Sequence, residues 1–146
     1  EWLIPSVLLG RKLVFAGDPT LFPGLLSGVR ELGMDVLLMA APARRPRHGL
    51  ALDDQGPLPP IAFAPPEATL RRVLERRRGE IDLVIADTEF HGSGWAGRLE
   101  FGFPCFFRHA LVEQPYLGIG GWAWFVQEIS SCLLSRMRRA DSMPTT

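Results

Sequence analysis

The sequence has little lysine, little cysteine and no net charge. Only Lys12 among its 16 basic residues is a lysine, and the acidic residues also number 16. Balanced charge creates no overall field that would attract nucleic acid or an anionic membrane. The two cysteines, Cys105 and Cys132, show neither CxxC nor zinc-ligand spacing, and they are too few to ligate an iron–sulfur cluster. We therefore expect the chain to bind no nucleic acid and to hold no metal or cofactor by itself.

Long apolar runs are missing as well. None approaches the roughly 20 residues that a bilayer-spanning helix needs, and the first residues lack the basic start of a signal peptide. The first residue is not methionine. We expect a fragment of a larger cytoplasmic subunit, folded as one domain over residues 1–141 and followed by a disordered tail at 142–146. A composition of 47% apolar and 22% charged residues is typical of a globular domain.

Short, continuous apolar runs predict buried parallel strands near 13–17, 35–40, 81–86 and 99–103. Amphipathic helices between the first three strands make right-handed crossovers, which keep the strands parallel. The expected fold class is therefore α/β. We predict a three-layer α/β/α arrangement around a four-stranded parallel, Rossmann-like sheet with strand order 2-1-3-4.

Helix ends and one irregular segment can also be predicted. Asp18 is expected to cap the first helix with Pro19 at its first position, and Gly33 to end it. The second helix is expected over 66–78, and the last should begin near Gly121. Residues 42–66 contain seven prolines and a cluster of arginines. They predict a long surface excursion without a long helix, the most mobile part of the domain, with room for a brief strand at 61–63.

Open parallel sheets bind ligands at the carboxyl ends of their strands. The segments 17–20, 87–91 and 103–109 follow predicted strands. Their polar candidates for contact with a ligand are Asp18, Thr88, Glu89, His91 and His109. Each has a plainer role: Asp18 more often caps its helix, Thr88 and Glu89 more often lie in a solvated loop, and the histidines more often make structural hydrogen bonds.

Aromatic residues gather in the final third of the chain: Phe101, Phe103, Phe106, Phe107, Tyr116, Trp122 and Trp124. They could line a pocket for a flat ligand, or they could form core and subunit interface, and the sequence favours neither. No GxGxxG follows the first strand and no GxxxxGK[ST] occurs, so dinucleotide binding through that motif and nucleotide hydrolysis are not expected.

Several short motifs, in order and spacing, resemble one known family. The final third contains the segments IDLVIA (81–86), EFGFP (100–104) and PYLGIGG (115–121), followed by an aromatic helix. The opening contains LGRKLV (9–14), GDP (17–19) and ELG (31–33). Over most of residues 8–137 the chain resembles the C-terminal domain of nitrogenase component 1 proteins, a family that includes the catalytic subunits of dark-operative protochlorophyllide reductase and chlorophyllide reductase.

The resemblance implies one domain of a two-component oxidoreductase subunit. Its partners would be the N-terminal remainder of the same subunit, a paired homologous subunit and an ATP-dependent iron protein that delivers electrons. An iron–sulfur cluster would be held in the full complex, and this chain alone would be inactive. A histidine shortly before the Pro-Tyr-x-Gly motif ligates the metal cofactor in the nitrogenase α subunit, and that position falls at Arg108, beside His109.

The resemblance and the place of residues 103–109 after the fourth predicted strand together predict that His109 is catalytic. The position at strand ends predicts that Asp18, Thr88, Glu89, His91, Phe103 and Arg108 face the substrate or cofactor. Two other functions stay open. The protein could be a cofactor-assembly scaffold with the same fold, or a non-redox α/β module that binds a small molecule or a tetrapyrrole.

Overall fold

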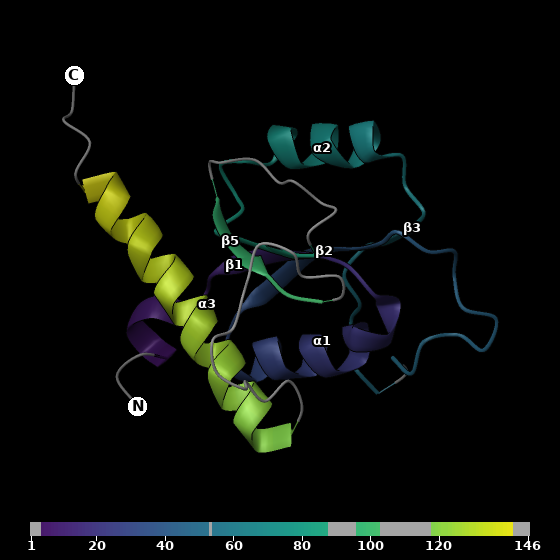
Figure 1. Ribbon diagram of the computed structural model, residues 1–146, viewed down its shortest axis with the longest axis horizontal. Coiled ribbons are helices and arrows are strands. Elements are labelled where there is room, and N and C mark those ends of the chain that lie inside the picture. The colour runs from purple at the N-terminus through teal and green to yellow at the C-terminus, as the bar shows by residue number, and fades with distance from the viewer. Residues whose placement is uncertain (1–3, 53, 88–95, 103–117, 142–146) are drawn as a thin grey trace, which may run out of the picture.

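The structure is a computed structural model that describes residues 4–52, 54–87, 96–102 and 118–141 (Figure 1). The predicted tail at 142–146 lies outside these residues. The elements in chain order are η1 (Ile4–Leu8), β1 (Lys12–Ala16), η2 (Pro19–Leu21), α1 (Phe22–Glu31), β2 (Asp35–Ala41), β3 (Ile61–Phe63), α2 (Glu67–Arg76), β4 (Leu83–Ala86), β5 (Gly97–Glu100) and α3 (Gly118–Asp141).

The strands form one parallel sheet in the order β3-β2-β1-β4-β5. The predicted order of the four main strands is confirmed, but the sheet has five strands rather than four. The additional strand, β3, runs beside β2 after the excursion: the amide of Met39 donates to the carbonyl of Pro60, and that of Ala64 to the carbonyl of Ala41. Among the described residues of 42–60 there is no helix, as expected; the mobility of this segment stays a prediction.

The observed boundaries of β1 and β2 differ by one residue from those predicted, and those of β4 and β5 differ by two or more. β4 begins at Leu83 rather than at residue 81, and β5 covers Gly97–Glu100 rather than 99–103. The reason is register, because Gly97 is paired with Leu83 and Glu100 with Ala86. Apolarity marked the buried part of this last strand, whereas pairing with β4 decides where it starts and stops.

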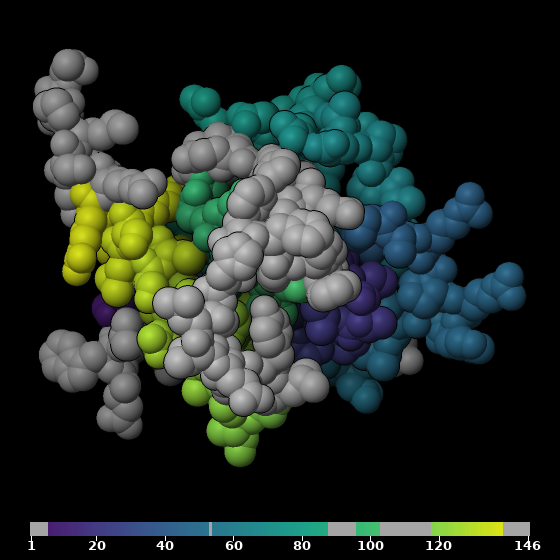
Figure 2. Space-filling view, viewed as in Figure 1, coloured from purple at the N-terminus to yellow at the C-terminus, as the bar shows by residue number. Residues whose placement is uncertain are grey.

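The sheet separates two apolar layers. Alternate strand side chains point to opposite faces, so Phe15 and Ile85 pack with α1 and α3, while Val14 and Val84 pack with α2. Figure 1 shows α1 and α3 on one side of the sheet and α2 alone on the other, and in the space-filling view the teal atoms of the α2 region form the top of the molecule (Figure 2). The fold is thus the predicted three-layer α/β/α arrangement.

Asp18 and Pro19 begin the helical segment after β1, as predicted, but as a 3₁₀ turn that precedes α1 rather than as the first turn of the α-helix. Asp18 Oδ1 accepts hydrogen bonds from both the amide and the hydroxyl of Thr20 at 2.8 Å, and Pro19 occupies the first position of η2, which leads into α1. Gly33 follows α1 with φ +75°, a backbone conformation that residues other than glycine rarely adopt. A Cβ at Gly33 would also lie less than 3.0 Å from Leu9 Cδ1.

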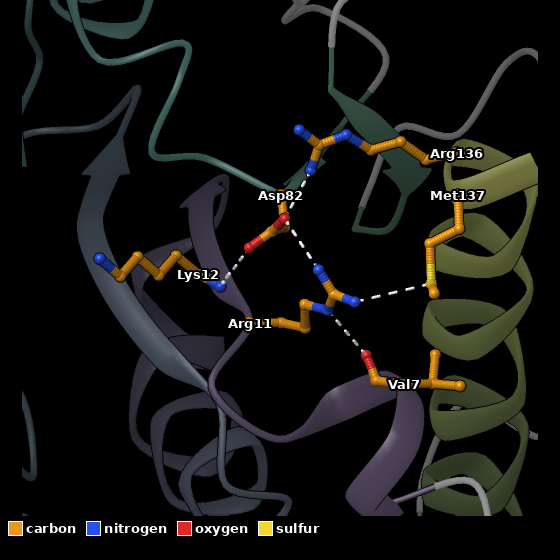
Figure 3. Close-up of polar contacts among 6 residues, drawn as sticks. All are labelled: Val7, Arg11, Lys12, Asp82, Arg136 and Met137. Atoms are coloured by element: carbon orange, nitrogen blue, oxygen red, sulfur yellow. Dashed lines mark hydrogen bonds and ion pairs between the residues drawn. The ribbon is translucent and has the colours of Figure 1, made fainter. Parts of the chain in front are cut away.

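A polar cluster around Asp82 joins four elements at the amino ends of the strands (Figure 3). Asp82 precedes β4, and its carboxylate accepts from the amide of Lys12 at 3.0 Å and from Arg136 Nη1, on α3, at 2.7 Å. Arg11 Nη1 lies 3.5 Å from the same carboxylate, and Arg11 Nε donates to the carbonyl of Val7 in η1. This cluster, which we call the Asp82 cluster, is at the opposite edge from the carboxyl ends, so its role is structural.

Candidate functional site

The carboxyl edge of the sheet has a point where neighbouring strands continue in opposite directions. After β1 the chain passes through α1 to β2, whereas after β4 it continues to β5 on the other side. β1 and β4 are adjacent, and their ends, Ala16 and Ala86, are paired. Open α/β sheets bind ligands at such a topological switch point. Two cavities open at this edge, one on each face of the sheet.

The first cavity, of about 190 Å³, lies on the α2 face, and we call it the α2-side cavity. Its described lining residues are Ala16, Ala40, Ala41, Pro42, Pro65, Glu67, Leu70 and Asp87. They come from the ends of β1, β2 and β4 and from the first turns of α2. Asp87 is only 7% exposed, and its amide donates to the carbonyl of Ala16 at 3.3 Å. A buried carboxylate therefore lies directly at the switch point.

The second cavity, of about 270 Å³, lies on the α1 and α3 face, and we call it the aromatic cavity. Its described lining residues are Thr20, Leu21, Gly24, Leu25, Phe101, Gly118, Gly121, Trp122 and Phe125. Phe101 and Phe125 have ring centroids 4.8 Å apart, and those of Trp122 and Phe125 are 5.4 Å apart. Tilted ring pairs of this kind make a wall suited to apolar or flat groups.

A glycine in α1 allows Trp122 to lie against that helix. A Cβ added at Gly28 would come within 3.0 Å of three atoms of the Trp122 ring, whereas one added at Gly24 would meet nothing within 4 Å. Of the described members of the aromatic group, Phe101 and Trp122 line the cavity and also pack against the buried core that contains Phe125. A bound flat ligand and a subunit interface both stay predictions.

Most of the predicted site residues cannot be compared with this geometry. Thr88, Glu89, His91, Phe103, Arg108 and His109 lie outside the described residues. Asp18 is described and exposed beside the switch point, with its carboxylate engaged as a cap. Asp18 therefore has the helix-capping role that the sequence also allowed.

The structure adds residues that were not chosen from the sequence. Asp87 and Thr20 belong to the strand-end segments 87–91 and 17–20, and their position after an apolar strand is the sequence signal for both. No local signal indicates that Glu67 lines a cavity.

The described residues do not fit an iron–sulfur cluster. They contain no group of three or more His, Cys, Asp and Glu side chains that could hold a metal ion. Their single cysteine, Cys132, approaches the carbonyl of Arg98 in β5, with Sγ 3.2 Å from that oxygen. The described cysteine, Cys132, therefore packs α3 against the edge strand β5. The described helices are too short or too polar to cross a membrane.

Comparison with known proteins agrees with this architecture. The family model described as "Nitrogenase component 1 type Oxidoreductase" matches residues 4–134. A solved chain described as "Nitrogenase Cp1 at pH 6.5" superimposes with a TM-score of 0.78 at 19% sequence identity. The match covers 99% of this chain and 34% of that chain, so the protein spans about a third of the length of the solved relative. At such identity the superposition shows the fold alone.

Proposed function

Because this chain belongs to the nitrogenase component 1 type oxidoreductase family, we propose that it works as one domain of a nitrogenase-like, cytoplasmic reductase subunit. The observation that carries the proposal is the family match over residues 4–134, which includes the sheet and both cavities at its carboxyl edge. In the complete subunit this edge would face the cleft in which the substrate or its cofactor is reduced.

We propose that the domain acts with three partners: the N-terminal remainder of its subunit, a paired homologous subunit and an ATP-dependent iron protein. Electrons would arrive from the iron protein through an iron–sulfur cluster held elsewhere in the complex. The described residues offer no ligand set for that cluster. The contribution of this domain would therefore be to bind and orient the group that is reduced, and to exclude water from it.

The aromatic cavity is the part of the edge best suited to that task. Its wall of rings offers apolar area that can cover a flat group, and Gly24 and Gly118 leave space at its mouth because a Cβ at either would meet nothing within 4 Å. Thr20 brings a hydroxyl to the rim, with its own proton engaged on Asp18. That hydroxyl can therefore accept a hydrogen bond from a ligand.

We propose His109 as the catalytic residue of the complete site. As neutral imidazole it could ligate a metal, and as imidazolium it could donate a proton to the reduced substrate. Thr88, Glu89, His91, Phe103 and Arg108 would line the same cleft. Asp18 would contribute mainly by holding the turn that carries Thr20.

The test is reconstitution of the complete subunit with its paired subunit and the iron protein under anaerobic conditions. We expect iron and acid-labile sulfide in the complex but none in this chain alone, and ATP-dependent oxidation of the reduced iron protein when substrate is present. A complex that takes up a cofactor and transfers it onward without turnover would identify a scaffold. A subunit that binds ligand but never accepts electrons would identify a non-redox module.

Two variants test the assigned edge. Gly24→Leu should place a side chain in the aromatic cavity and reduce turnover, whereas the matched control Gly24→Ala should leave turnover close to that of the parent. His109→Ala should abolish turnover without lowering the melting temperature. A lower melting temperature with normal turnover per folded enzyme would make His109 structural.

A further inference from the structure

A third cavity, of about 290 Å³, lies between β3 and residues 45–58 of the excursion, and we call it the excursion cavity. Five of its described lining residues are apolar and the sixth is basic: Leu50, Leu52, Leu58, Ile61, Phe63 and Arg45. These six residues line neither the α2-side cavity nor the aromatic cavity. Figure 1 shows this part of the excursion, in blue, at the end of the sheet where β3 lies, opposite the end beside α3. The excursion cavity is therefore a different place from the carboxyl edge that the reductase proposal uses.

The apolar wall of the excursion cavity follows from the position of β3 in the sheet. Ile61 and Phe63 alternate with Ala62 along this strand, so both point to the face covered by α1 and α3. β3 is the last strand of the sheet, and no further strand covers them. Both side chains stay half-buried, and Leu58 is 48% exposed. Apolar surface is thus left partly open to solvent at this end of the sheet.

Hydrogen bonds hold the excursion in the shape that encloses the cavity. The amide of Leu52 donates to the carbonyl of Leu50 at 2.8 Å, and the amide of Gln55 donates to that of Leu52 at 3.0 Å. Arg30, in the last turn of α1, donates from its guanidinium to the carbonyls of Gln55 and Pro57. The cavity is therefore formed by the fold itself, before any ligand binds.

Arg45 gives the excursion cavity its charge. Its side chain is exposed and forms no ion pair with the described residues, and no acidic residue is among those that line the cavity. In the sequence around it, Arg44, Arg45 and Arg47 outnumber Asp53 and Asp54, so the local field is positive as well. A guanidinium offers a planar fork of donors that matches the two oxygens of a carboxylate. An apolar wall with one such cation at its rim favours an amphiphilic anion.

We propose that the excursion cavity binds a small aliphatic carboxylate. The carboxylate would accept hydrogen bonds from Arg45, and the alkyl chain would cover Leu58 and the two β3 side chains, Ile61 and Phe63. The volume is the share of roughly ten water molecules in the liquid, which suits an alkyl chain of about six carbons. Binding here requires neither electrons nor an iron–sulfur cluster, so the inference goes beyond the proposed function.

The test uses the complete subunit in its complex, labelled with ¹³C at isoleucine and leucine methyl groups. Hexanoate, 1-hexanol and hexylammonium serve as probes of nearly equal length and different charge. Hexanoate should give saturable shifts of the Ile61 and Leu58 methyl signals. Its affinity should be roughly three- to tenfold higher than that of 1-hexanol, the factor expected for a bidentate ion pair at a partly exposed rim. Hexylammonium should bind more weakly than 1-hexanol, because Arg45 repels it.

Variants separate the charge from the apolar wall. Arg45→Met should lower the affinity for hexanoate to that for 1-hexanol, which itself should stay nearly unchanged. The matched control Arg44→Met, at an exposed arginine outside the described lining, should change hexanoate affinity by less than about twofold. Leu58→Ala should lower the affinities for hexanoate and 1-hexanol by the same factor, because contact with the alkyl chain is lost whatever the head group. All three side chains are exposed, so these variants should fold.

Equal affinity for hexanoate and 1-hexanol, a preference for hexylammonium, or no saturable shift at Ile61 and Leu58 would overturn the proposal. An equal loss of hexanoate affinity in Arg45→Met and Arg44→Met would overturn it as well. The comparison of probes uses the unaltered protein and measures no turnover. The result is therefore independent both of the folding of the variants and of the reductase assay.

Discussion

Asp82→Ala is expected to be the most informative stability variant, because it removes the acceptor shared by the Asp82 cluster. The bond from the amide of Lys12 should contribute roughly 1.5 kcal/mol, as expected for a hydrogen bond to a charged group. The Arg136 side chain is 33% exposed and that of Asp82 is 21% exposed, so screening reduces their ion pair to roughly 0.5 to 1 kcal/mol. Arg11, at 3.5 Å, adds little. The expected loss in free energy of unfolding is therefore about 2 to 2.5 kcal/mol.

Urea denaturation followed by circular dichroism measures this loss directly, and the melting temperature should fall by roughly 8 to 10 °C for a domain of this size. At high salt the difference in free energy of unfolding between the parent and Asp82→Ala should decrease by less than half. Salt screens the ion pair with Arg136 but does not weaken the hydrogen bond from the amide of Lys12 to the same extent. Hydrogen exchange should quicken in the part of α3 that carries Arg136. Asp82→Asn, which keeps an acceptor for Lys12, should lose only about 1 kcal/mol.

The matched control is Glu67→Gln, which removes an exposed ion pair to Arg71 within α2. Such a pair contributes about 0.3 to 0.5 kcal/mol. If Asp82→Ala costs no more than this control, the Asp82 cluster does not hold η1, β1, β4 and α3 together, and our account of it is wrong.

Three further predictions concern packing and pH. Gly28→Ala should destabilise the chain by about 1 to 3 kcal/mol, because its methyl group would displace the Trp122 ring. Gly24→Ala in the same helix should stabilise the chain by about 0.4 to 1 kcal/mol, and equal effects of the two variants in urea denaturation would refute the packing of Trp122 against Gly28. Ile129→Ala, at a side chain with 0% exposure, should cost about 2 to 5 kcal/mol, whereas Ile119→Ala, at 90% exposure, should change stability by less than about 0.5 kcal/mol. A hydrogen bond from Arg77 and then its charge lower the pKa of Glu80, so this carboxylate stabilises the fold above its unfolded-state pKa and the contribution is lost as pH falls through the lowered value. Arg77→Met should raise the pKa of Glu80 in an NMR titration, and an unchanged pKa would contradict this cause.

The sequence by itself determined the elements that depend on local chemistry. Continuous apolar runs such as 13–17 marked the buried strands, and Asp18, Pro19 and Gly33 marked where the first helix begins and ends, because capping and backbone conformation act over a few residues. The short crossovers also limited the strand order, which the structure has as predicted. The order and spacing of short motifs predicted the family, which the match over residues 4–134 confirms.

Only the tertiary structure decided what depends on segments far apart in the chain. The addition of β3 beside β2, the start of β5 at Gly97 and the approach of Trp122 to Gly28 each require two distant segments to meet. The same holds for the two cavities, because the residues that line each of them come from different strands and helices that meet at one edge of the sheet. No local pattern encodes such meetings, since a side chain's propensity describes its own segment, whereas register and packing depend on the free energy of the whole fold.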